Sequence, residues 1–108
     1  MHIAVIGGLE RHEADIARRA STLGHTIEFH RGRVGGRRAG ELESVIQRCE
    51  LAIIVTRVNS HGAMYIAKRV ASRHDRPALL ARTCTPSSFS TIVQSFVARA
   101  PAMAAREA

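Results

Sequence analysis

The sequence predicts an α/β protein built on a small, doubly wound, parallel sheet of four strands. Short apolar runs that indicate buried strands alternate with longer segments whose apolar residues recur at helical spacing. This alternation is typical of parallel strands joined by right-handed helical crossovers, with helices on both faces of the sheet. Numbered along the chain, the expected strand order is 2-1-3-4.

The first half of the chain is expected to form two strands and two helices. We predict strands over residues 2–6 and 26–30 and helices over about 10–23 and 41–49. Gly24 directly follows the first helix, where a glycine in the left-handed conformation commonly ends a helix. Residues 31–40 contain four glycines and four arginines, which predicts a loop.

The second half repeats the alternation. We predict strands over residues 51–56 and 78–82, a helix over about 60–74, and a last helix that ends near residue 99. Thr85 and Pro86 are a matched pair of start signals for that last helix, as N-cap and first helical residue. Residues 1–99 are therefore expected to be a single domain, with residues 100–108 as a frayed tail.

The composition favours an anionic partner. The net charge is +7, and Lys68 is the only lysine among the 16 basic residues. A basic chain suits nucleic acid, but the four aromatic side chains offer few surfaces for base stacking, so nucleic acid is not the favoured partner. No signal peptide and no apolar run of about 20 residues is present, so we expect a cytoplasmic protein with no membrane contact.

A polar segment follows the most apolar strand, between that strand and the next helix. It contains Thr56, Arg57, Asn59, Ser60 and His61. In a parallel sheet the turns after the strands share the carboxyl edge, and ligands of open α/β sheets bind at that edge. The segment therefore marks the expected binding site.

The other turns at that edge add arginine, histidine and hydroxyl groups, and Glu10 is the only carboxylate among them. Such a crevice, with free helix N-termini, favours an anion. We expect a small polar or anionic ligand, with a diatomic or metal-associated species left open. The predicted binding residues are Gly7, Gly8, Arg11, His30, Arg33, Thr56, Asn59, Ser60, His61 and Arg82.

Other site chemistry is less well supported by the sequence. The patterns of dinucleotide and nucleoside-triphosphate loops are absent, so no cofactor is indicated. His and Cys residues show no metal-ligand spacing, so no metal site is predicted. Cys84 lies between Arg82 and a helix N-terminus, features that lower a thiol pKa, which makes Cys84 a redox candidate.

The chain from Met1 to Val97 resembles a small bacterial family known as domain of unknown function 2325. The resemblance rests on Val5-Ile6-Gly7-Gly8, on the Gly32-Arg33 loop, on Ile54-Val55-Thr56 with Asn59 and His61, and on the basic segment around Arg82. It implies a Rossmann-like fold, here with the flavodoxin-like strand order, and it carries no established activity.

Three functions are open at this point. The first is a non-enzymatic module that binds or senses a small ligand, as a homodimer. The second is binding of nucleic acid or a regulatory partner through the arginine-rich loop at residues 31–38. The third is a hydrolase or transferase that uses His61 with Cys84 or Ser60. No carboxylate is placed to orient His61, so the enzyme is the least favoured.

Overall fold

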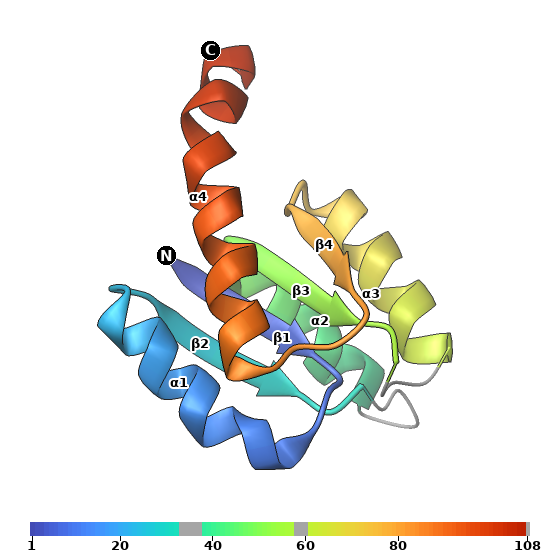
Figure 1. Ribbon diagram of the computed structural model, residues 1–108. Coiled ribbons are helices and arrows are strands. Elements are labelled where there is room, and N and C mark those ends of the chain that lie inside the picture. Colours follow the sequence, from blue (N-terminus) through green and yellow to red (C-terminus); the bar gives the residue numbers. More distant parts are fainter. Residues whose placement is uncertain (33–37, 58–60, 108) are drawn as a thin grey trace.

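A computed structural model describes residues 1–32, 38–57 and 61–107, of which residues 38, 39, 61 and 100–107 are described by their backbone alone. A parallel sheet of four strands lies between two layers of helices (Figure 1). Its strands are β1 (His2–Ile6), β2 (Thr26–His30), β3 (Leu51–Val55) and β4 (Ala78–Ala81). All neighbouring strands are parallel and the order is β2-β1-β3-β4, which confirms the predicted fold class and strand order.

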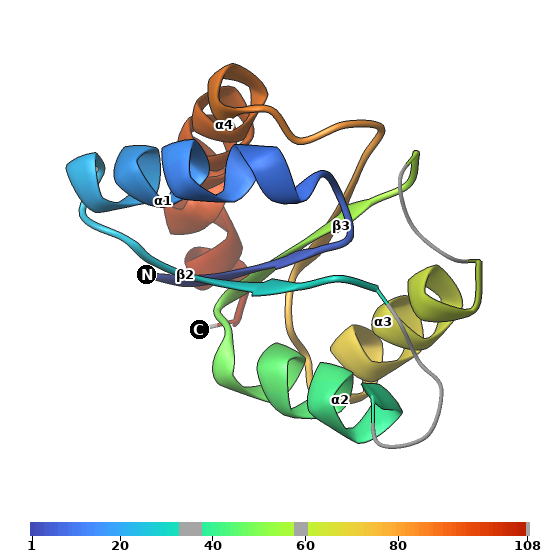
Figure 2. The same cartoon turned by 90° about the horizontal axis from the view of Figure 1, so that it is seen from below.

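The helices divide between the two faces of the sheet. They are α1 (Glu13–Thr22), α2 (Arg38–Arg48), α3 (His61–Arg73) and α4 (Pro86–Glu107), with a 3-10 turn η1 (Glu10–His12) before α1. Figure 2 shows α1 and α4 above the sheet and α2 and α3 below it. Within the described ranges, no helix is both long and apolar enough to cross a membrane.

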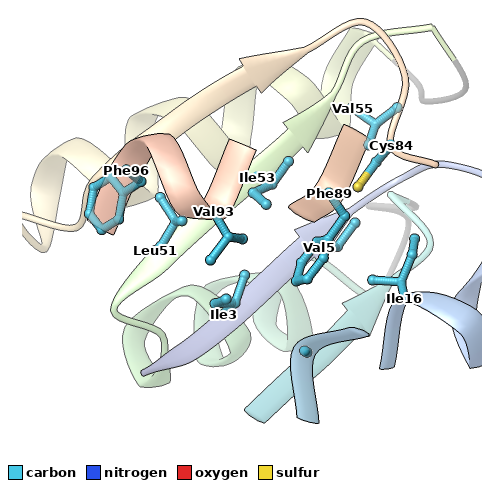
Figure 3. Packing of buried hydrophobic residues seen from close by; sticks show 11 residues of the cluster. Ile3, Val5, Ile16, Leu51, Ile53, Val55, Cys84, Phe89, Val93 and Phe96 are labelled. Carbon is cyan, nitrogen blue, oxygen red and sulfur yellow. The ribbon is translucent and has the colours of Figure 1, made fainter. Parts of the chain in front are cut away.

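The β3 strand lies at the centre of the core. All five of its residues are buried, which is typical of a parallel strand covered on both faces. Alternate residues of β3 enter two apolar clusters, one under α1 and α4 and one under α2 and α3. Figure 3 shows the first cluster, in which Phe89, Val93 and Phe96 of α4 pack on Ile3, Val5, Leu51 and Ile53 of the sheet.

Two helix boundaries differ from those predicted. The α2 helix begins at Arg38, inside the segment that was expected to be a loop, and its Gly40 is exposed with open space where a side chain would lie. The α4 helix continues to Glu107, past the expected end near residue 99, and stands out from the body of the molecule (Figure 1). The alanines after Phe96 have high intrinsic helix propensity and favour this extension, whereas Pro101 opposes it.

The predicted helix signals are present where expected. Gly24 follows α1 and has φ of 82°. This left-handed conformation is unfavourable for residues other than glycine. At the start of α4, the Thr85 hydroxyl accepts a hydrogen bond from the Ser88 amide at 3.2 Å, and the Ser88 hydroxyl accepts one from the Thr85 amide at 2.8 Å. This reciprocal pair caps the helix with the chain's own groups.

A hydrogen-bonded network covers the edge strand β2 near its amino end. The ring of His2 bridges the Thr26 hydroxyl and the Glu28 carboxylate, at 2.7 Å on each side. Arg48 donates two hydrogen bonds to that carboxylate, at 2.6 and 3.1 Å. Strand pairing brings His2 beside Thr26.

The first prediction concerns the contact between α4 and the sheet. Phe89→Ala should lower the free energy of unfolding by about 3–5 kcal/mol, because Phe89 has no exposed surface and its removal leaves a cavity. Chemical denaturation measures the loss. Val97→Ala on the same helix is the control: Val97 is 44% exposed, and its change should stay within about 0.5 kcal/mol. Equal effects of the two variants would contradict the assigned packing.

The second prediction concerns Glu28. Hydrogen bonds from Arg48 lower the pKa of Glu28 from 4.5 to about 2, with a smaller contribution from His2 and with burial opposing them. A lowered pKa stabilises the folded state above the pKa of the unfolded chain, and the contribution is lost as pH falls through about 2. Urea unfolding of wild type and Glu28→Gln should therefore differ most above pH 4.5 and converge toward pH 2. A difference that does not depend on pH would refute this assignment.

Candidate functional site

A tight turn after β1 opens the carboxyl edge of the sheet. Gly7 and Gly8 have φ of 86° and 90°, which glycine adopts without steric cost. The Gly7 amide donates to the His30 carbonyl at 2.7 Å, so the pairing of β1 with β2 continues into the turn. A side chain at Gly8 would meet Val55 at 3.5 Å, so β3 runs close beside the turn.

A cavity of about 370 Å³ lies at this turn, on the side of α1 and α4. Its size falls in the range of small-molecule sites. It lies at the ends of β1 and β3, where the connections leave in opposite directions and ligands of open α/β sheets bind. We call it the edge cavity. It is lined by Gly8, Leu9, Arg11, His12, Val55, Arg57, Thr83, Cys84 and Thr85.

The edge cavity is lined by cationic and neutral groups. Arg11, His12 and Arg57 line it, and no carboxylate of the described residues does. Among the described residues, neither of these arginines is in an ion pair. The nearest acidic residue in sequence, Glu10, instead accepts a 2.7 Å hydrogen bond from Arg31, which lowers the pKa of Glu10. The arginines of the cavity therefore keep their charge available to a ligand.

The predicted site residues divide between the two faces of the sheet. Gly8, Arg11 and Cys84 line the edge cavity. His30 is paired with Ile6, and Ile6 packs under α2 and α3, so the side chain of His30 lies on that opposite face. There its Nδ1 accepts a hydrogen bond from the Gly32 amide at 3.0 Å.

Arg57 lines the edge cavity, whereas Thr56 and Arg82 do not. The Thr56 amide donates to the Ala81 carbonyl at 2.8 Å and the Arg57 amide to the Arg82 carbonyl at 3.1 Å. Two successive amides that both bond to the β4 side depart from the alternation of a regular strand, so the chain bends where β3 ends. Arg33, Asn59, Ser60 and the side chain of His61 lie outside the described residues.

Arg57 and His12 line the edge cavity and were not among the predicted binding residues. Arg57 was recognised at the carboxyl edge, but nothing in the sequence showed that it would line this cavity. The η1 turn places His12 at the cavity, where it is partly exposed.

The expectation of a lowered thiol pKa at Cys84 is wrong. Burial raises the pKa of Cys84 to about 11, and the residue is 4% exposed. Figure 3 shows its side chain beside Val55 and Phe89, in the apolar cluster under α4. Cys84 therefore contributes an apolar wall to the edge cavity. Its redox role remains a prediction, and the raised pKa of its thiol does not support it.

Metal-ligating groups do not gather in the part of the chain that the structure describes. No three His, Cys, Asp or Glu side chains there are placed to hold one ion. The homodimer, the nucleic-acid loop and the enzyme that uses His61 remain predictions.

Comparison with known proteins identifies the family. The family described as an uncharacterized protein conserved in bacteria (DUF2325) matches residues 2–96, and the chain belongs to it. No curated protein and no solved structure matches the chain. The matched region runs from β1 into α4 and so contains the whole edge cavity.

The third prediction concerns the two thiols. Burial raises the pKa of Cys49 as well as that of Cys84, so little of either thiol is ionised near neutral pH. Because the thiolate is the nucleophile, iodoacetamide at pH 8 should label Cys84 in the native protein at least about tenfold more slowly than in the unfolded chain. Mass spectrometry of peptides resolves the two sites. Equal rates in the native and unfolded protein would contradict the burial of Cys84.

Proposed function

We propose that this member of the DUF2325 family is a binding module for a small anion, with the anion's phosphate or carboxylate group held in the edge cavity. The observation that carries the proposal is the gathering of Arg11, His12 and Arg57 around one cavity that no carboxylate lines. An unpaired guanidinium group favours an anion with two oxygens in one plane, which it binds through two parallel hydrogen bonds.

The remaining walls of the edge cavity suit binding. The hydroxyl group of Thr83 adds neutral hydrogen-bonding capacity, whereas that of Thr85 is engaged by Ser88 in the cap of α4. Leu9, Val55 and the buried Cys84 supply an apolar side that contacts the rest of a ligand. A few polar groups among apolar walls are the usual composition of a small-molecule site.

Binding without catalysis is the form of the proposal that these residues support. The described lining contains no carboxylate to act as a general base or to orient the His12 ring as one, and the thiol of Cys84 is held protonated by burial. The groups that remain are the two arginines, the His12 ring and the Thr83 hydroxyl, which bind and orient a ligand.

The fourth prediction tests the proposal with inorganic pyrophosphate as the probe. Arg57→Gln and Arg11→Gln should each weaken binding at least about tenfold in isothermal titration calorimetry, since each removes a charge-assisted hydrogen bond worth about 1.5–3 kcal/mol. Binding should also weaken as salt rises.

Arg69→Gln is the matched control, because it removes the same charge from an exposed position on α3, where Arg69 lies over the Tyr65 ring at 5.5 Å. It should leave the affinity within about twofold, as screening predicts for a distant surface charge. The proposal fails if pyrophosphate does not bind, or if all three variants weaken binding equally, since the affinity would then reflect net charge alone.

A further inference from the structure

A second hollow opens between α1 and α4, next to the edge cavity. Its volume is about 930 Å³, too large for a single phosphate. We call this hollow the α1/α4 groove. It is lined by Asp15, Arg18, Arg19, Thr22, Leu23, Pro86, Ser87, Ser90 and Gln94. The two hollows adjoin at the start of α4, because Thr85 lines the cavity and Pro86 lines the groove.

Arginine and hydroxyl groups dominate the α1/α4 groove. Arg18 pairs with Asp15, the single carboxylate of the lining. Arg19 has no carboxylate within ion-pair distance among the described residues, and its Nη1 donates to the Ser90 hydroxyl of α4 at 3.4 Å. This contact spans the groove and holds the Arg19 guanidinium beside the first turns of α4. A ligand anion bound there would be favoured both by that guanidinium and by the positive end of the α4 dipole.

The spacing along α1 sets the distance between the two hollows. Arg19 follows His12, the N-cap of α1, by seven residues, and a helical rise of 1.5 Å per residue places them about 10 Å apart along the axis. Arg11 and His12 of η1 line the edge cavity, and Arg19 of α1 lines the groove. Two successive segments of the chain therefore present one arginine to each hollow.

We propose that the α1/α4 groove is a second binding site, and that it and the edge cavity hold one linear ligand with phosphate groups about 10 Å apart, of the chemistry of a polyphosphate chain. The inference rests on the proposed function, since the edge cavity holds one end of the ligand. Among the described residues no Phe, Tyr or Trp side chain lines either hollow, which favours a chain of phosphates over a ligand with stacked bases.

The test compares inorganic pyrophosphate with a linear polyphosphate long enough to reach from the edge cavity to Arg19. Wild-type protein should bind the long chain at least about tenfold more tightly than pyrophosphate. Arg19→Gln should remove most of that gain and leave pyrophosphate affinity unchanged, whereas Arg57→Gln should weaken both probes. Arg69→Gln, which carries the same change in net charge, should preserve the gain.

The outcomes separate this inference from the proposed function. If pyrophosphate binds in an Arg57-dependent way but the long chain gains nothing, or gains equally in Arg19→Gln and Arg69→Gln, the groove has no role and the edge cavity remains a site. If pyrophosphate does not bind, both proposals fail. A single-stranded oligonucleotide that binds more tightly than polyphosphate of equal charge, and loses this advantage in Arg19→Gln, would overturn the assignment to a ligand without bases.

Discussion

The complete burial of β3 is the constraint on which the rest of the structure depends. Its five residues point alternately to two faces, and none is more than 1% exposed. Both faces must therefore be covered by helices, which requires α1 and α4 on one side and α2 and α3 on the other. The connections after β1 and β3 then leave toward opposite faces, and the edge cavity lies where they part.

The charge of the edge cavity follows from the way its neighbours are paired. Arg31 binds Glu10, so the carboxylate closest in sequence to Arg11 is satisfied elsewhere. Similar pairs tie Arg48 to Glu28 and Arg73 to Glu43, away from the carboxyl edge. In the described part of the chain four of the nine acidic residues are thus paired with particular arginines, whereas Arg11, Arg57 and Arg19 line the two hollows without a carboxylate partner.

Much of the fold could be predicted from the sequence, because strongly apolar runs and helix-start residues act locally. Leu51–Val55 cannot be placed anywhere but in a buried strand, and Thr85 with Pro86 sets the start of α4. The start of α2 and the end of α4 were harder, because glycine at position 40 and proline at position 101 argue locally against a helix.

The site was predicted less completely, because its composition depends on which face each residue takes. Thr56, Arg57 and Arg82 all lie at the carboxyl edge, but only Arg57 lines the edge cavity, because the chain bends where β3 and β4 end. The thiol of Cys84 illustrates the same limit. Its neighbours in sequence suggest a positive environment, but packing against Phe89 places it in an apolar one.

The central claim is that an anion binds in the edge cavity on the α1 and α4 side of the sheet. A two-dimensional ¹H–¹⁵N NMR titration with inorganic pyrophosphate tests it most directly. The account predicts that the amide signals of Gly8, Arg11, Arg57 and Thr83 shift together and saturate, while those of α2 stay in place. Shifts confined to α2 and α3, or spread evenly over all the arginines, would contradict it.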